Sequence, residues 1–191
     1  MSGKSTIEIE IKARIPSIED MAARLEQEGA TFEAELDHED VYYDLPEEMG
    51  TFWASDEALR VRSSKNGTDG TEKAFLTYKG PKLDKRTKTR TEIEVGIEDA
   101  AKAEAMLEAL RYRLAVAVRK HRRLYRLDDV EITLDEVEHL DDKFMELEIM
   151  GDACNADEGK ERLFATLERL GVSRDDCERK SYLELLLECM A

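Results

Sequence analysis

Apolar and charged residues alternate with period two through much of this chain. The clearest case is 7–12, where isoleucines alternate with Glu8, Glu10 and Lys12. Because residues i and i+2 of a β-strand point to the same face, such a segment predicts a strand with one apolar and one charged face. The same interpretation applies to 58–62, 76–79, 88–95, 117–127, 130–137 and 143–150.

Helical spacing of apolar residues occurs in four other segments. One begins after Pro16-Ser17 and stops at Gly29, and another stops at Gly171. A serine before the first turn and a glycine after the last are common helix boundaries. We expect helices over 17–28, 98–111, 158–170 and 180–189, with enough apolar surface to cover one face of a sheet.

The charged faces leave two interpretations of the sheet. A single charged face is typical of an antiparallel sheet with one side in water. Here nearly every predicted strand has such a face, and both signs of charge occur on it. This repetition favours an α+β fold in which a closed β-barrel has a charged interior and the helices pack outside. The chain has few prolines and glycines and no linker, so we expect a single domain over residues 1–191.

The charged faces together hold many bases and many acids. The bases are Lys12, Arg60, Arg62, Lys79, Lys88, Arg90, Lys120, Arg122 and Arg126. The acids are Glu8, Glu10, Glu92, Glu94, Glu131, Asp135, Glu146 and Glu148. Converging cations need an anion, and Arg and Lys bind phosphate oxygens well. Grouped carboxylates bind hard divalent cations. A polyphosphate with a divalent metal would satisfy both groups.

The overall charge limits the choice of partner. A net charge of −16 repels nucleic acid and anionic membranes unless basic residues are gathered locally. No apolar run approaches a membrane span of about 18 residues, and three cysteines without paired spacing suggest reduced thiols. We therefore expect a cytoplasmic protein, as a monomer or homodimer. The basic stretch 79–90 is either a solvated loop or a mobile flap over phosphates, and the aromatic pairs at 42–43 and 52–53 suggest core or rim packing.

The segment Glu8–Lys12 resembles the ExExK signature of the CYTH superfamily, also called triphosphate tunnel metalloenzymes. Further segments follow in the family's order across nearly the whole chain, and the set is most similar to the class IV adenylyl cyclase branch and its archaeal relatives. Thiamine and inorganic triphosphatases share this fold. The segments are VYYDLP at 41–46, DEALRVR at 56–62, LTYKGP at 76–81, RTEIEV at 90–95, VRKHRRLY at 118–125, ITLDEVEHLDDKFMELEI at 132–149 and KSYLELL at 180–186.

The resemblance implies an eight-stranded antiparallel tunnel, and it implies roles for individual residues. Catalytic roles would fall to Glu10, Lys12 and Glu148. Ligands of Mg²⁺ or Mn²⁺ would be Glu8, Glu10, Asp135, Glu146 and Glu148. Triphosphate would be bound by Lys12, Arg60, Arg62, Lys79, Lys88, Arg90, Lys120 and Arg122. The stretch before Arg90 varies in such families, so Lys88, Glu92 and Glu94 are carried over less securely.

Three functions are compatible with this set of residues. In a cyclase, the ribose 3′-hydroxyl attacks the α-phosphorus of ATP and pyrophosphate leaves. In a hydrolase, water attacks the terminal phosphorus of inorganic triphosphate, thiamine triphosphate or a nucleoside triphosphate. Both reactions depend mainly on positioning and charge neutralisation. The third function is a non-catalytic module that binds polyphosphate or a nucleotide.

Overall fold

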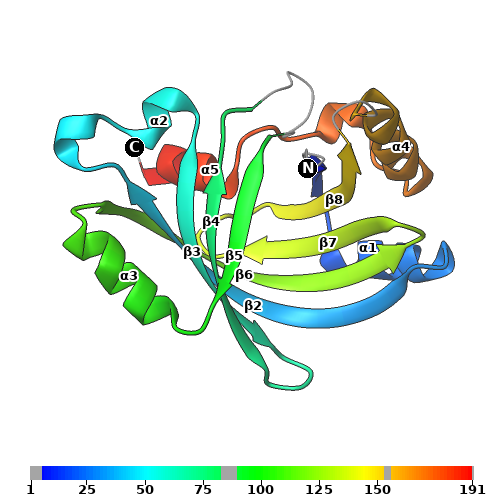
Figure 1. Ribbon diagram of the computed structural model, residues 1–191. Helices are drawn as coiled ribbons and strands as arrows, with labels where there is room; N and C mark the ends of the chain where they lie inside the picture. Colours follow the sequence, from blue (N-terminus) through cyan, green and yellow to red (C-terminus); the bar gives the residue numbers. More distant parts are fainter. Residues whose placement is uncertain (1–5, 83–89, 153–155, 191) are drawn as a thin grey trace.

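The computed structural model describes residues 6–82, 90–152 and 156–190 (Figure 1). Its strands and α-helices are, in chain order, β1 (Thr6–Ile15), α1 (Ile18–Gln27), β2 (Thr31–Asp44), α2 (Phe52–Ser55), β3 (Ala58–Asn66), β4 (Glu72–Lys79), β5 (Glu92–Ile97), α3 (Ala100–Ala109), β6 (Arg113–Leu127), β7 (Val130–Val137), β8 (Lys143–Asp152), α4 (Ala156–Arg169) and α5 (Tyr182–Met190).

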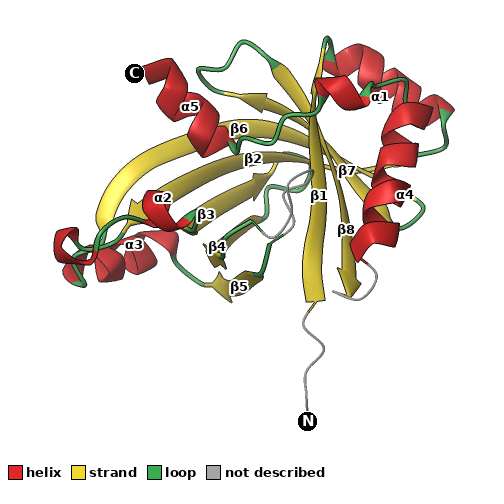
Figure 2. Cartoon of the chain, turned by 90° about the horizontal axis from the view of Figure 1, so that it is seen from above, coloured by secondary structure: helices red, strands yellow, loops and turns green. Residues whose placement is uncertain are grey.

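All eight strands belong to one sheet, in the order β1-β8-β7-β6-β2-β3-β4-β5. Every neighbouring pair in this order is antiparallel. The sheet is strongly curled, with β1 and β8 turned across the direction of β3 and β4 (Figure 2). The expected α+β class with eight antiparallel strands is therefore confirmed.

The sheet is a curled half-barrel, and the continuous closure that we expected is not seen. β1 and β5 are its two edges, and among the described residues one isolated bridge connects them, between Glu8 and Arg90. All six residues of β5 pair with β4. Because β5 has six residues, a ladder between its described residues and β1 would be short.

The longest strands are β2 and β6, and β2 was not anticipated. The segment 31–40 is rich in Glu and Asp, which are uncommon in strands. Its composition therefore does not predict a strand. Its register with β6 shifts between Phe32 and Ala34 and again between Tyr42 and Tyr43. Such irregularities increase strand bending and help to curl a sheet. The hairpin between β3 and β4 is also tighter than expected, because β3 continues to Asn66.

The apolar face of β1 forms the main core with α1 and α4. Ile9 and Ile11 are buried there together with Leu25 and Leu163. α4 approaches β1 closely at Gly159, where an added Cβ would lie 2.6 Å from Ile9 Cδ1. The glycine therefore permits a helix-to-strand contact that no other residue would allow without a shift.

The helix boundaries follow the predicted signals. Ser17 caps α1, its hydroxyl accepting a hydrogen bond from the Asp20 backbone N–H at 3.1 Å. Gly29 and Gly171 follow α1 and α4 with positive φ angles of 89° and 77°. The four predicted helices are thus confirmed to within about two residues of their ends, which is the usual uncertainty of helix boundaries.

α5 differs from the other long helices in the face that it covers. α3 packs on the outer side of β3, where Leu107 contacts Val61. α5 instead packs against Val118 and Phe144, with Tyr182 among the contacts. By strand alternation these two strand residues share the face of the charged residues, so α5 lies against the inner face. The expectation that all helices pack outside is wrong for α5, because this face becomes apolar at one end.

Candidate functional site

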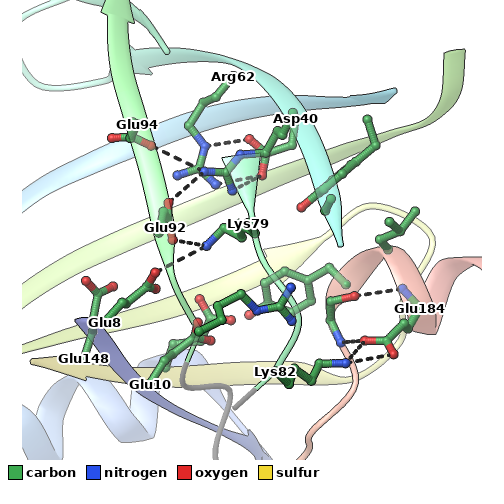
Figure 3. Close-up of a pocket in the computed structure, with 18 of the residues that line it drawn as sticks. Glu8, Glu10, Asp40, Arg62, Lys79, Lys82, Glu92, Glu94, Glu148 and Glu184 are labelled. Atoms are coloured by element: carbon green, nitrogen blue, oxygen red, sulfur yellow. Dashed lines mark hydrogen bonds and ion pairs between the residues drawn. The ribbon is translucent and has the colours of Figure 1, made fainter. Parts of the chain in front are cut away.

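The inner face of the curled sheet encloses a cavity of about 500 Å³ (Figure 3). Each of the eight strands contributes at least one side chain to its lining, and the N-terminal turn of α5 contributes more. The predicted site residues that line it are Glu8, Glu10, Arg60, Arg62, Lys79, Arg90, Glu92, Glu94, Lys120, Arg122, Glu146 and Glu148.

Arg60 and Arg62 come from neighbouring positions on the inner face of β3. Both lie against Asp40 of β2, whose carboxylate accepts hydrogen bonds from Arg62 Nε and Nη2 at 2.5 and 2.7 Å. Burial works against ionisation of Asp40, but the two arginines hold its pKa well below the usual range. Arg60 Nε is buried and has no hydrogen-bond partner within the described part of the chain. Asp40 was not among the predicted site residues, because the acidic segment that forms β2 does not have the composition of a strand.

Lys79 connects β4 to both edge strands. Its ammonium lies 2.6 Å from a Glu92 carboxylate oxygen on β5 and 3.5 Å from one on Glu8 of β1. Burial opposes the charge on Lys79, yet the carboxylates around it raise its pKa. These ion pairs cross the seam between the edges, which Figure 3 shows beside Glu10 and Glu148.

Three carboxylates from adjacent strands lie side by side at one end of the cavity. Glu10 pairs in register with Glu148, and Glu148 pairs in register with Glu131. Burial, followed by the charges of Glu8, Glu10 and Glu131, raises the pKa of Glu148 to about 9. This shift favours the protonated form of Glu148 at neutral pH in the absence of a further cation.

Arg122 is fixed by two acids of the strands beside it. Its Nε and Nη2 atoms donate to Asp135 at 2.7 and 2.5 Å, and Nη2 also donates to Glu146 at 2.6 Å. Asp135 is fully buried and also accepts a hydrogen bond from the Tyr182 hydroxyl at 2.8 Å. It is not among the side chains that line the cavity, and its contacts here orient Arg122. Its role as a metal ligand stays a prediction.

Lys120 is buried beside Arg122, with its ammonium 3.4 Å from Asp135. Burial, together with the charge of Arg122, lowers its pKa to about 8. Lys120 and Arg122 thus place two cationic groups on the inner face of β6, beside Asp135 and Glu146. On the same strand Arg119 faces outward and pairs with Glu39, as the alternation predicts.

Three predicted bases are placed differently from the rest. Lys12 is 1 % exposed and does not line the cavity. Its ammonium donates to the Lys180 carbonyl and lies 4.0 Å from the centre of the Tyr182 ring. Arg126 pairs with Glu33 and Glu131 at the far end of β6. Lys88, with most of the predicted basic flap, lies outside the described residues.

The rim of the cavity contains residues that the sequence did not single out. Lys82 bridges two segments, with its ammonium 3.2 Å from Asp56 after α2 and 3.1 Å from Glu184 of α5. Glu184 in turn accepts a hydrogen bond from the Ser181 backbone N–H at 2.6 Å. Lys82 belongs to the basic stretch noted above, but its two partners come from segments that only the fold brings together.

The carboxylates suit a hard divalent cation by their chemistry. Among the described residues, no group of three or more Asp, Glu, His or Cys side chains is already arranged to hold a metal ion. Burial, followed by the charges of Glu8, Glu10 and Glu131, nevertheless disfavours the ionised form of Glu148. A cation bound there would relieve this repulsion, and Mg²⁺ commonly needs only one or two carboxylates when phosphate supplies further ligands.

No helix in the described part of the chain has the length and hydrophobicity needed to span a bilayer.

Known proteins that resemble this chain indicate its family. A sequence model described as the CYTH domain matches residues 6–182. The chain is 39 % identical over 180 residues to a protein of Methanocaldococcus jannaschii named "Putative adenylate cyclase", covering 94 % of this chain and 98 % of that one.

Two further comparisons agree with this match. The chain is 31 % identical to the adenylate cyclase CyaB of Aeromonas hydrophila, covering 93 % of this chain and 87 % of the other. The solved structure of the PH1819 protein from Pyrococcus horikoshii superposes with a TM-score of 0.85 at 40 % identity, over 95 % of this chain and 98 % of that one. Both matches extend over nearly the full length of each chain, as a shared fold requires.

Proposed function

Because the chain belongs to the CYTH domain family, we propose that it is a metal-dependent phosphoryl-transfer enzyme acting on a triphosphate bound in the cavity. The reaction that we propose is that of a class IV adenylate cyclase. The 3′-hydroxyl of ATP attacks the α-phosphorus, forming the cyclic ester and releasing pyrophosphate. The relatives named as adenylate cyclases support this choice.

One observation carries the proposal. Cationic side chains from distant parts of the sequence, including Arg60, Lys79 and Lys120, line one cavity of about 500 Å³. They are buried or half-buried, so an anion bound there would be shielded from water. Hydrogen bonds to charged groups in such places contribute roughly 1.5–3 kcal/mol each. Several of them on one ligand would favour a highly charged anion such as triphosphate.

The acidic end of the cavity supplies the ligands proposed for Mg²⁺ or Mn²⁺. Glu8, Glu10 and Glu148 would hold the ion, with Glu146 close by on β8. When bound, such an ion neutralises phosphate charge and can lower the pKa of an attacking hydroxyl. Its binding would require Glu148 to release its proton, since metal ligands must be deprotonated.

The remaining charged residues position the ligand. Arg122, held in one orientation by Asp135 and Glu146, would direct its guanidinium group at phosphate oxygens. Arg60 and Arg62 would act similarly from β3, with Asp40 as their support. Preorganised donors of this kind stabilise charge without reorganising during the reaction. Lys12 contacts the segment that leads into α5, and its proposed role in turnover remains a prediction.

We further propose that a bound triphosphate completes the tunnel. The edge strands already approach each other at Glu8 and Arg90, and Lys79 pairs with acids on both sides of the seam. A polyanion bound to Lys79 and Arg90 would draw β4 and β5 toward β1. The predicted closed barrel would then be the ligand-bound form of the half-barrel.

Product analysis tests the proposal directly. The protein is incubated with ATP and either Mg²⁺ or Mn²⁺, and the products are separated by chromatography. We expect cyclic AMP and pyrophosphate in equal amounts, and loss of both with Glu10→Gln. Release of orthophosphate would instead identify a triphosphate hydrolase, and tight binding without turnover would identify a binding module. The proposed site itself would be refuted if calorimetry detected no binding of ATP or inorganic triphosphate.

A further inference from the structure

Trp53 is the single tryptophan of the chain, and it is unusually exposed. It lies on α2, lines the cavity, and leaves 60 % of its surface in contact with solvent. Other large apolar side chains are also exposed, but Leu110 and Leu114, for example, do not line the cavity. An exposed tryptophan at the entrance of a charged cavity calls for an explanation, because aromatic side chains usually bury much of their surface.

The short helix α2 is held firmly although one turn of helix has little stability of its own. Thr51 caps it, accepting a hydrogen bond from the Ala54 backbone N–H at 3.1 Å. The Phe52 backbone N–H donates to Asp44 at 2.7 Å, and the Phe52 ring stacks on Tyr112 with centroids 6.4 Å apart. Phe52 thus anchors the helix to the sheet, and the next residue is directed to the rim.

The other end of α2 is also fixed. Asp56 follows in the left-handed conformation with φ of 56°, and its backbone N–H donates to the carbonyls of Phe52 and Trp53. Its carboxylate accepts a hydrogen bond from the Lys82 backbone N–H at 2.9 Å. With both ends held, the backbone that carries Trp53 has a defined place at the cavity entrance.

The side chains of the cavity become more exposed from its interior to its rim, where apolar side chains stand among charged ones such as Lys82 and Asp56. Arg60 and Lys120, inside, are 5 % and 7 % exposed, whereas Trp53 and Met150 at the rim are 60 % and 63 % exposed. A ligand with a charged end and an uncharged end would therefore enter with its phosphates first. Its uncharged end would remain at the rim, within the reach of the apolar side chains there.

We propose that Trp53 stacks on a planar aromatic ring, such as a nucleobase, attached to the bound triphosphate. This inference rests on the proposed function, since the phosphates determine which end of the ligand reaches the rim. An indole ring offers a flat face, and stacking between aromatic side chains and bases tolerates different bases. Inorganic triphosphate, which lacks a ring, gains nothing from Trp53. The residue thus distinguishes nucleoside triphosphates from inorganic triphosphate.

Trp53 also provides the assay, because the emission of the protein comes from this one indole. The purified full chain is titrated with ATP and, separately, with inorganic triphosphate, both with Mg²⁺. We expect ATP to quench or shift the emission and inorganic triphosphate to leave it nearly unchanged. Calorimetry on the same samples measures the two dissociation constants independently of fluorescence.

Variants separate stacking from folding and from phosphate binding. Trp53→Ala should weaken ATP binding about tenfold while changing inorganic triphosphate binding less than about twofold. Trp53→Phe keeps a flat ring and should retain most of the ATP affinity. Met106→Ala, which removes an exposed side chain of α3 that does not line the cavity, should change neither.

The outcomes distinguish this inference from the proposed function. If the wild type binds both triphosphates with equal affinity and Trp53→Ala changes neither, the stacking proposal fails while the phosphate site stands. Equal weakening of both ligands by Trp53→Ala would also overturn it, because the residue would then support the site as a whole. If the wild type binds neither triphosphate, both proposals fail.

Discussion

Glu148 makes the stability of the ligand-free protein depend on pH. Its pKa is raised from the usual 4.5 to about 9, because burial and three neighbouring glutamates disfavour its charge. Between these values the folded state keeps a proton that the unfolded state releases. Stability due to this group is therefore fully present below the unfolded pKa and is lost as pH rises toward the folded pKa. The free energy of unfolding falls by at most about 1.4 kcal/mol per pH unit in this window.

Glu148→Gln removes the titration and keeps the shape of the side chain. From about pH 6 to about pH 8 the wild type should lose up to about 3 kcal/mol relative to this variant. For a chain of this size, each kcal/mol shifts the melting temperature by about 2–4 °C. Between these two pH values the melting temperature of the variant relative to that of the wild type should therefore rise by up to about 6–12 °C.

The assay is thermal unfolding followed by circular dichroism, with a chelator present to remove metal. Glu158→Gln on the exposed side of α4 is the matched control and should follow the wild type at each pH. Addition of Mg²⁺ should stabilise the wild type more than Glu148→Gln, because the variant has lost one of the proposed ligands. If the wild type and Glu148→Gln had the same melting temperature at every pH between about 6 and 8, the raised pKa of Glu148 would be refuted. A variant that becomes less stable relative to the wild type as pH rises would refute it as well.

Three other predictions concern different parts of the structure. Arg60→Ala should weaken binding of inorganic triphosphate at least about tenfold by calorimetry, whereas outward-facing Arg123→Ala should change it little. Asp135→Asn should lower the free energy of urea unfolding by about 3–5 kcal/mol, because it leaves Arg122 buried without its main partner. An unchanged value would contradict that pairing. Gly159→Ala should cost about 1–3 kcal/mol in the same assay through the clash of its Cβ with β1, although alanine favours helices.

The residues that could be predicted from sequence follow a local rule. Alternation along β1, β3 and β6 assigned Glu10, Arg62 and Lys120 to the charged face, and the structure places all three on the cavity. A strand's two faces are determined by its own sequence, so no knowledge of its neighbours was needed. The helix ends followed similarly from Ser17 and Gly29.

The contacts that escaped prediction depend on which strands become neighbours. Asp40 lies in an acidic segment that does not look like a strand, and only its pairing with β3 brings it to Arg60 and Arg62. The position of α5 on the inner face could not be predicted either, because the apolar residues of this helix are compatible with either face of the sheet. Pairing between the two edges of the sheet also depends on contacts between distant segments, which alternation within 88–95 does not specify.

The pairing of β1 with β8 has a consequence for how the chain folds. Thr6 lies opposite Asp152 and Ile15 opposite Lys143, so the ladder joins two segments that are far apart in the sequence. During synthesis, β1 emerges from the ribosome long before its partner, and the buried face of Ile9 and Ile11 has no strand to complete it. Contacts between such distant segments slow folding, and unpaired strands promote aggregation in the interval. The glutamates of β1 keep this strand charged until β8 has been synthesised, and this charge disfavours pairing of β1 with other chains.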